Sequence, residues 1–312
     1  MKFAFVFPGQ GSQSIGMMHG YSDIPIVHQT FIEASDILHQ DFWAIINDNP
    51  IDDLNLTINT QPLMLIAGIA VYRAWMSLGG TEPAFMAGHS LAEYTALVAS
   101  EALTFTDALS LVRFRAQVMQ QAVPDGTGGM AAILGLDDDA IRAVCIEVTN
   151  NADGESLEPA NFNSPGQVVI AGHRNAVSQG IKLAQTKGAK RAVMLPMSIP
   201  SHCTLMKSAA QEMYQQLEKI DFKPPRIPIF HNVDVQIHQS DAAIRDSLVK
   251  QLYSPVRWAD TIQTLAAAGV THIAECGPGK VLTGLNKRID RDLHSLALTD
   301  SEAIRQAINI LK

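Results

Sequence analysis

A short apolar run that leads into a serine turn and then a helix is the feature that most restricts how this chain folds. The run at residues 84–87 is typical of a buried strand, and the small polar turn Gly88-His89-Ser90 follows it directly. Over residues 91–98 the apolar side chains recur at helical spacing. A strand, a sharp turn with serine at its apex and a helix together predict a nucleophile elbow. The alternative is that Ser90 only caps an ordinary helix.

The elbow departs from the usual Gly-x-Ser-x-Gly pattern at one position, where Ala92 replaces the last glycine. Helix and strand pack closely there, and alanine adds a methyl group while it removes backbone freedom. We expect Ala92 to be tolerated if its φ and ψ are helical and its Cβ finds room.

Strand and helix signals alternate through most of the chain. Residues 2–7 form a strand signal that ends in the glycine-rich loop 8–12, whose spacing matches neither a dinucleotide fingerprint nor a Walker motif. Further helices are predicted over residues 26–38, 61–78, 106–123, 205–220, 241–252 and 258–268, and further strands over 227–232 and 272–275. This alternation predicts an α/β fold with a mostly parallel sheet covered by helices.

The rhythm changes after the boundary Pro124–Gly129. Strands are predicted over residues 130–134, 160–163, 167–171 and 190–195, and helices over 138–148 and 175–187. The order β-α-β-β-α-β is the ferredoxin-like plan. We therefore expect a discontinuous large domain, residues 1–125 and 198–312, with a small ferredoxin-like domain inserted at residues 126–197.

Composition excludes several function classes. The net charge of −8 argues against a general nucleic-acid binder, which needs clustered basic residues. The three cysteines, Cys145, Cys203 and Cys276, have no metal-ligand spacing and do not form a disulfide framework. The N-terminal residues hold no apolar signal core, and the apolar helix near residues 63–78 contains Arg73. The sequence predicts a cytoplasmic protein with no metal and no nucleic-acid or membrane partner.

Ser90 and His202 are the candidate nucleophile and base, because a serine hydroxyl needs a base and histidine is the usual partner. Asp107 and Asp125 fall between them in the chain, but neither lies in a loop after a strand. A dyad whose imidazole is oriented by a backbone carbonyl is at least as plausible as a triad.

Arg115 is the candidate for charge recognition. On a helical wheel it falls on the apolar face of its helix, where burying a guanidinium without an anion is costly. It either packs its stem and reaches solvent or a structural carboxylate, or it binds a ligand carboxylate in bidentate fashion. Gln10, between two glycines, and the N–H of Leu91 are candidates for an oxyanion hole, or Gln10 is a solvated turn residue.

Several segments resemble malonyl-CoA:acyl carrier protein transacylases over nearly the whole chain. The matching segments are Phe5–Gln13, Gly88–Tyr94, Arg115, Asn161–Gln167, Pro200–His202 and Gly277–Gly279. The resemblance implies a hydrolase-like large domain with a ferredoxin-like insertion. It also implies roles for individual residues: Ser90 as the acylated nucleophile, His202 as base and then acid, Gln10 and Leu91 as backbone oxyanion donors, Arg115 as carboxylate clamp, Gln251 as the residue whose backbone carbonyl orients His202, and Asn163 as a cleft residue.

The resemblance further implies the reaction and its partners. Malonyl-CoA acylates Ser90, and the phosphopantetheine thiol of acyl carrier protein then takes the malonyl group, in a ping-pong mechanism for fatty acid biosynthesis. It implies no permanently bound cofactor, and we expect a monomer. In this resemblance the Gln251 side chain carries little weight, and His89 is structural.

An acidic carrier protein needs a local basic patch on this acidic chain. Lys190-Arg191 and Lys287-Arg288 are the candidate docking pairs, and the alternative for each is a solvated pair of charges. Three alternative functions stay open: a discrete acyltransferase of a polyketide synthase, a serine thioesterase or esterase, and a catalytically silent carrier-binding module.

Overall fold

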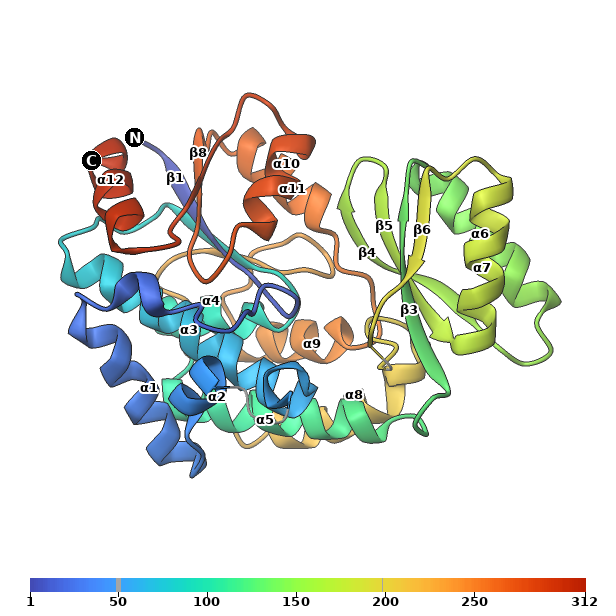
Figure 1. Cartoon of the computed structure of the whole chain (residues 1–312), viewed down its shortest axis with the longest axis horizontal. Coiled ribbons are helices and arrows are strands. Elements are labelled where there is room, and N and C mark those ends of the chain that lie inside the picture. Colours follow the sequence, from blue (N-terminus) through green and yellow to red (C-terminus); the bar gives the residue numbers. More distant parts are fainter. Residues whose placement is uncertain (49–51, 198) are drawn as a thin grey trace.

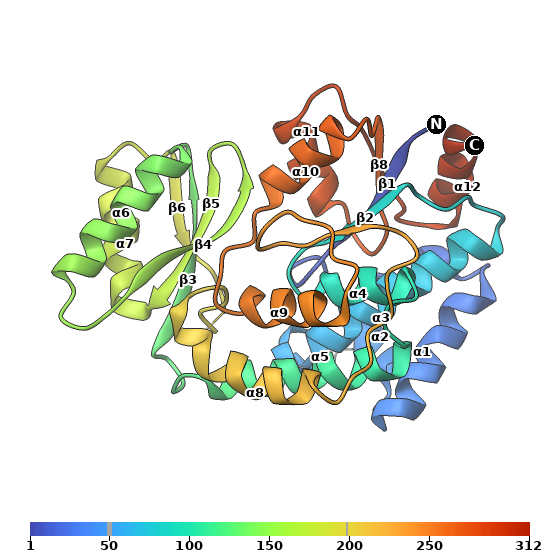
Figure 2. The same ribbon diagram turned by 180° about the vertical axis from the view of Figure 1, so that it is seen from behind.

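The computed structural model describes residues 1–48, 52–197 and 199–312 and shows two separate sheets, each with its own helices (Figures 1 and 2). Within these residues the larger sheet has five strands, and every neighbouring pair in it is parallel. Its order is β7 (Ile229–Phe230), β2 (Phe85–Gly88), β1 (Phe3–Phe7), β8 (His272–Glu275) and β9 (His294–Ala297). The parallel ladder brings the carboxyl ends of β1 and β2 to one edge, where ligands bind in α/β folds.

Helices cover both faces of this sheet, as the fully buried strand β1 requires. Side chains alternate across a strand, so Phe3, Phe5 and Phe7 pack into one core while Ala4 and Val6 pack into another. The first core contains side chains of α1 (Pro25–Leu38), α2 (Phe42–Asp48), α3 (Thr57–Ser77), α4 (Ala92–Ala99), α5 (Phe105–Gln121), α8 (Lys207–Leu217), α9 (Asp241–Gln251) and α12 (Ser301–Leu311). The second contains α10 (Trp258–Ala267) and α11 (Val281–Ile289).

The smaller sheet is antiparallel and follows the ferredoxin-like order. Its strands are β4 (Leu157–Ser164), β5 (Gln167–His173), β3 (Gly128–Leu134) and β6 (Arg191–Met194), in that spatial order. The helices α6 (Asp138–Asn151) and α7 (Arg174–Thr186) share a core with one face of it. Its other face contributes Met130 and Val169 to a cluster with Cys203, which joins it to the larger part.

A short backbone ladder also ties the two sheets together. The N–H of Phe162 donates to the carbonyl of Val256 at 2.9 Å, and the N–H of Val256 donates to the carbonyl of Ala160 at 2.9 Å. Because Val256 follows α9 and precedes α10, the strand β4 is held against the larger part next to these helices.

The α/β class, the parallel sheet and the separate antiparallel sheet confirm the predicted fold class. The predicted boundary at residue 198 lies outside the described residues, and the domain limits stay a prediction. The structure adds α2, β9 and α12, which the sequence analysis did not predict. It also shortens the strand predicted over residues 227–232 to Ile229–Phe230. No helix in the described ranges is long and apolar enough to span a membrane.

Candidate active site

Ser90 lies at the apex of a tight turn between β2 and α4, as an elbow requires. Its φ of 55° is in the left-handed region, which a non-glycine residue adopts at a cost of about 1–3 kcal/mol. The Asn232 side chain holds this turn: Oδ1 accepts from the N–H of Ser90 and Nδ2 donates to the carbonyl of Gly88, both at 2.7 Å. The strained backbone thus projects the serine hydroxyl at the edge of the sheet.

The close approach of strand and helix falls on Gly88, not on Ala92. A Cβ on Gly88 would lie 1.9 Å from the carbonyl oxygen of Ala92, so a side chain there is excluded. Ala92 is the first residue of α4 and is fully buried. Ala92 therefore has a helical backbone, and its methyl group is accommodated in the interior. These are the two conditions under which we expected alanine to be tolerated here.

The Ser90 hydroxyl and the His202 imidazole are in contact. Ser90 Oγ lies 2.7 Å from His202 Nε2, and His202 Nδ1 lies 2.7 Å from the carbonyl oxygen of Gln251. A carbonyl only accepts, so Nδ1 carries the proton and Nε2 is free to accept from the serine. Asp107 and Asp125 instead bond Thr104 and Gln120 on or next to α5, and neither contacts the imidazole.

Burial keeps His202 neutral. Its side chain is 3% exposed and its backbone φ is 63°, a second strained residue in the site. Burial first, and then the positive charge of Arg115, lower the pKa of His202 from its ordinary 6.5 to about 3. The imidazole is therefore in its basic form at neutral pH, as a general base needs.

Two backbone N–H groups near Ser90 are available to an oxyanion. The N–H of Ser90 is already bonded to Asn232, which leaves the N–H of Leu91 as the next donor at the start of α4. No acceptor bonds the backbone N–H of Leu91 or of Gln10 in the described part of the chain. Gly9 lies so close to the turn that a Cβ on it would be 2.6 Å from the carbonyl oxygen of His89. This close packing places Gln10 beside the elbow.

Arg115 on α5 is buried without a carboxylate in contact, in the ranges that the structure describes. It is 1% exposed; Nη1 donates to Gln61 Oε1 at 2.7 Å and Nη2 donates to Gln251 Oε1 at 2.9 Å. Burial lowers the pKa of this guanidinium, because its charge is removed from water. Its Nε is also buried and lacks a partner among the described residues. The head therefore reaches neither solvent nor a structural carboxylate, which favours the reading in which it binds a ligand anion.

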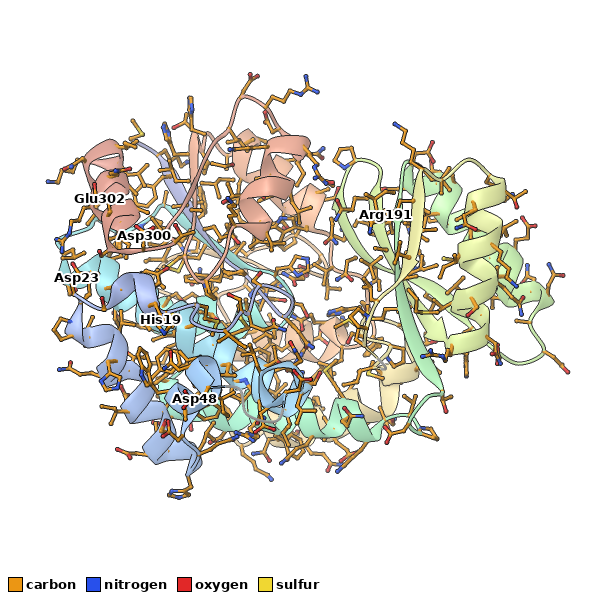
Figure 3. All side chains as sticks on the ribbon, in the orientation of Figure 1. His19, Asp23, Asp48, Arg191, Asp300 and Glu302 are labelled. Carbon is orange, nitrogen blue, oxygen red and sulfur yellow. The ribbon has the colours of Figure 1, made fainter. Side chains whose placement is uncertain are left out.

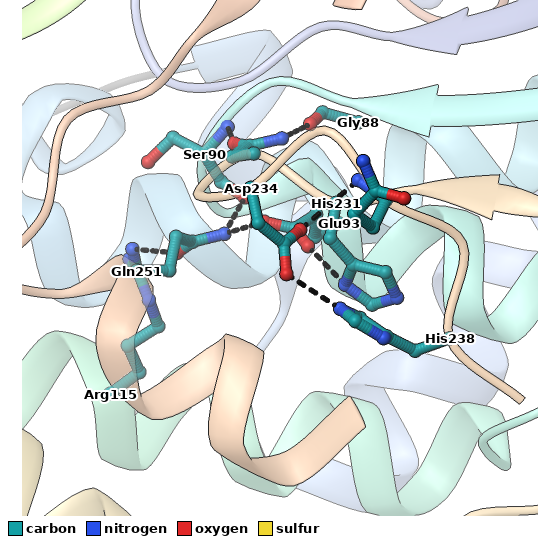
Figure 4. Close-up of polar contacts among 10 residues, drawn as sticks. Gly88, Ser90, Glu93, Arg115, His231, Asp234, His238 and Gln251 are labelled. Carbon is teal, nitrogen blue, oxygen red and sulfur yellow. Dashed lines mark hydrogen bonds and ion pairs between the residues drawn. The ribbon is translucent and has the colours of Figure 1, made fainter. Parts of the chain in front are cut away.

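The Gln251 side chain differs from expectation. Besides the carbonyl that bonds His202, its buried amide bonds three groups: Arg115 Nη2, the carbonyl oxygen of Ser90 at 2.9 Å, and Glu93 Oε2 (Figure 4). The small weight that we gave this side chain is therefore inconsistent with its contacts. Sequence alone offered no signal, because a polar residue at the end of an amphipathic helix is ordinary.

His89 and Asn163 meet across the two sheets. His89 Nε2 lies 2.9 Å from Asn163 Oδ1, which brings β4 against the elbow. Burial lowers the pKa of His89, and its ring packs 5.3 Å from that of Trp258. Asn163 is thus close to the nucleophile turn, as a cleft residue must be, and His89 makes a structural contact.

A groove of about 520 Å³ opens beside Gln10. It lies between the loops that follow β1 and β6, and its lining includes Leu56, Gln120 and Met197. The groove therefore brings Gln10, a candidate oxyanion donor, next to the loop that follows β6.

The four candidate docking residues are exposed and gather at one end of the smaller sheet. Arg288 Nη1 donates to Gln167 Oε1 at 2.6 Å, and Gln167 and Arg191 both pair with Leu134 from opposite sides. Two strand spacings, about 10 Å, therefore separate the backbones of Gln167 and Arg191. Lys190 precedes Arg191 and Lys287 precedes Arg288 in the chain, so the two basic pairs lie at the same end of the smaller sheet. Figure 3 labels Arg191 on β6 at this end.

Three residues with clear roles in the geometry were not assigned from the sequence: Asn232, Gln61 and Glu93. Gln61 was detectable, since it is a polar residue in an apolar helical run and is 1% exposed. Asn232 and Glu93 were not, because their partners are 142 and 158 residues away in the chain. No cluster of three or more metal-ligating side chains occurs within the described ranges.

Residues 4–298 match the family model described as the acyl transferase domain. A malonyl CoA-acyl carrier protein transacylase of Salmonella typhimurium is 52% identical over 98% of this chain and 99% of its own length.

Solved structures agree over the whole chain. The acyl-carrier-protein S-malonyltransferase from Burkholderia pseudomallei is 53% identical with a TM-score of 0.96, covering 99% of this chain and 100% of its own. A malonyl-transacylase in complex with a type II PKS acyl-carrier protein is 48% identical with a TM-score of 0.97, covering 99% of this chain and 100% of its own.

Proposed function

We propose a malonyl transfer reaction for this chain, which belongs to the acyl transferase domain family and, within it, to the malonyl CoA-acyl carrier protein transacylases. The malonyl group passes from malonyl-CoA to Ser90 and then to the phosphopantetheine thiol of acyl carrier protein, for fatty acid biosynthesis. One observation carries the proposal: the Ser90–His202 pair is joined through Gln251 to a buried Arg115 that has no carboxylate in contact within the described residues.

In the first half-reaction Ser90 Oγ attacks the thioester carbonyl and His202 Nε2 takes the hydroxyl proton. The Gln251 carbonyl accepts from Nδ1–H and stabilises the imidazolium that forms. The N–H groups of Leu91 and Gln10 donate to the oxyanion, where one such donor is worth about 2.7–4 kcal/mol. The C–S bond then breaks, and the leaving thiolate takes the proton from His202.

The second half-reaction runs the same groups in reverse. His202 Nε2 takes the proton of the carrier thiol, whose sulfur attacks the malonyl ester of Ser90. When the tetrahedral intermediate collapses, the C–O bond breaks and His202 returns the proton to Ser90 Oγ. The enzyme ends as it began, and no metal or redox group takes part in these steps.

Arg115 provides the selectivity for a dicarboxylic acyl group. The free carboxylate of malonate pairs with the buried guanidinium through a fork of N–H groups. A neutral acetyl chain leaves this charge unpaired, and the site penalises it for that reason.

Steady-state kinetics distinguish transfer from hydrolysis by a thioesterase of the same architecture. We expect parallel double-reciprocal lines for malonyl-CoA and holo acyl carrier protein, with malonyl appearing on the carrier as CoA is released. Ser90→Ala should abolish both signals. Release of CoA with free malonate and no malonyl carrier would contradict transfer.

The exposed residues Lys190, Arg191, Lys287 and Arg288 form the proposed docking surface for the acidic carrier. Reversing the charge of Lys190 and Arg191 to Glu should raise the KM for the carrier about threefold or more and leave malonyl-CoA hydrolysis unchanged. The matched control is the same reversal at Arg174 and Lys182, which are exposed basic residues on α7. Equal effects of the two double variants on the carrier KM would refute the surface.

The structural neighbour bound to a type II PKS carrier keeps a second pathway open. Comparison of kcat/KM for a fatty acid carrier and a polyketide carrier would assign the pathway. The monomeric state, the cytoplasmic location and the absence of a membrane partner stay predictions from the sequence, and sedimentation of the purified chain tests the first.

A further inference from the structure

Glu93 is a fully buried carboxylate in the first turn of α4, three residues after Ser90. Oε1 accepts from His231 Nδ1 at 2.6 Å and Oε2 accepts from the Gln251 amide (Figure 4). Neither lysine nor arginine pairs with it directly in the described part of the chain. A buried charge without a compensating charge is costly, so its counter-charge has to be found.

The orientation of the Gln251 amide identifies that counter-charge. A guanidinium only donates and a carboxylate only accepts, so Oε1 must face Arg115 and Nε2 must face Glu93. The reversed amide would place two donors together on one side and two acceptors together on the other. Arg115 and Glu93 are therefore joined as cation, amide and anion, with one side chain between them.

His231 does not supply the counter-charge. Its Nδ1–H bonds Glu93, while its Nε2 is buried and has no partner among the described residues. A neutral ring leaves only a lone pair unpaired at Nε2, whereas an imidazolium would leave a buried N–H unpaired at a larger cost. The ring therefore acts as a neutral donor, and Arg115 balances the charge of Glu93.

We propose that Glu93 and the Gln251 side chain are positioning residues that set the malonyl selectivity of Arg115; this inference rests on the proposed function. A carboxylate in direct contact would occupy the guanidinium fork and compete with the substrate. A carboxylate one amide away compensates the buried charge and leaves part of the fork free for a ligand. It also limits how tightly malonate is held, because two carboxylates then share one guanidinium.

Gln251 connects this charge pair to the catalytic dyad. Its amide donates to the carbonyl of Ser90 at 2.9 Å, and its own carbonyl accepts from His202 Nδ1 at 2.7 Å. Substitution of its side chain removes the amide but leaves the carbonyl in place. The positioning of Arg115 and the orientation of His202 are therefore separable by mutation.

Glu93→Gln removes the charge and keeps the shape. The new amide oxygen still accepts from Gln251, and its NH2 group faces His231, whose proton moves to Nε2. With one negative charge fewer, we expect half-saturation by malonyl-CoA at a concentration about three- to thirtyfold lower. The rate constant of Ser90 acylation by acetyl-CoA, which differs only by lacking the carboxylate, should change by less than the malonyl-CoA constant.

Gln251→Met breaks the connection without removing the charges. Arg115 then loses the acceptor of Nη2, and the guanidinium is no longer held in place. We expect the malonyl-CoA concentration for half-saturation to rise about tenfold or more, with a smaller effect on acylation by acetyl-CoA, which has no carboxylate for Arg115 to hold. The two variants thus move the same constant in opposite directions, which a loss of packing does not do.

The assay is single-turnover acylation of the full chain, followed by intact-mass spectrometry, with folding monitored by thermal melting. Glu101→Gln is the matched control, because Glu101 follows α4 and is exposed, with Arg226 as its partner. Parallel changes for malonyl-CoA and acetyl-CoA, or an unchanged malonyl constant in Glu93→Gln, would overturn the inference. If Glu93→Gln does not fold, two other variants test the inference. Glu93→Asp keeps the charge and should keep the malonyl selectivity, whereas Gln251→Met should lose it.

Failure of the proposed function gives a different result. In that case the parent chain itself shows no malonyl adduct. A parent chain that is malonylated, with variants whose selectivity is unchanged, refutes only the roles of Glu93 and Gln251.

Discussion

Replacing Arg115 by methionine is the perturbation whose effect follows most directly from the geometry. Methionine keeps an unbranched apolar stem in the buried site, but the charge and the N–H groups are lost. Arg115 is 1% exposed, and its guanidinium hydrogen-bonds two amide oxygens and no carboxylate within the described residues, so a substrate carboxylate would be its first anionic contact there. Hydrogen bonds to charged groups are worth about 1.5–3 kcal/mol each, and a bidentate pair therefore about 3–6 kcal/mol.

This free energy corresponds to a loss of roughly 10²- to 10⁴-fold in kcat/KM for malonyl-CoA, at about 1.4 kcal/mol per decade. For acetyl-CoA, which has no carboxylate to pair with Arg115, we expect a much smaller change and therefore a gain relative to malonyl-CoA. The assay is release of CoA in the presence of holo carrier protein, with each thioester in turn.

Arg113→Met is the matched control for this substitution. Arg113 lies on the same helix, is half-buried, and contacts Gln40 and the ring of Phe42. We expect the ratio of malonyl to acetyl kcat/KM to stay at the parent value in this variant. An unchanged ratio in Arg115→Met, or the same fall in both variants, would refute the carboxylate clamp.

The base His202 and the serine elbow can be tested by pH dependence and by substitution. Because burial lowers the pKa of His202 to about 3, kcat/KM should stay level from pH 8 to about pH 5, and an acid limb at pH 6.5 would contradict this. In the unfolded chain the His202 imidazole binds a proton below about pH 6.5, whereas in the folded chain it stays neutral there. The free energy of unfolding should therefore fall as pH drops from 6.5 toward 3. Gly88→Ala places a Cβ 1.9 Å from the Ala92 carbonyl oxygen and should lower the free energy of unfolding by about 3 kcal/mol or more in chemical denaturation. Ala92→Gly should lower it by only about 0.5–1 kcal/mol and keep kcat. Asn232→Ala removes both bonds that hold the elbow; we expect about 1–3 kcal/mol lower stability and at least about tenfold lower kcat, and a parent-like kcat would show that the turn holds its shape without them.

Local patterns were enough to predict the layers of the fold. The apolar run of β1 is buried on both faces, and that is why it lacks alternation in the sequence. The β-α-β-β-α-β order of the smaller part was visible because each element carries its own periodicity. The short strand β7 was overestimated, since its pairing with β2 covers only two residues and strand length depends on the partner.

The residues of the candidate site also differ in whether a local sequence pattern indicates them. The serine turn and the arginine on an apolar helix face are local signals, and both residues lie in the candidate site. The Gln251 amide and Asn232 could not be assigned, because their roles come from hydrogen bonds to residues 136 or more positions away. Such bonds depend on packing, which periodicity does not encode. Glu93 lies inside the matching segment Gly88–Tyr94, but its burial and its hydrogen bond to Gln251 are what indicate its role.

Intact-mass and peptide mass spectrometry after brief incubation with malonyl-CoA test the acylation of Ser90 most directly. We expect a single malonyl adduct on Ser90 that disappears when holo acyl carrier protein is added, and no adduct in Ser90→Ala. A parent chain that transfers malonyl without an adduct on Ser90, or an adduct that persists in Ser90→Ala, would contradict the central claim.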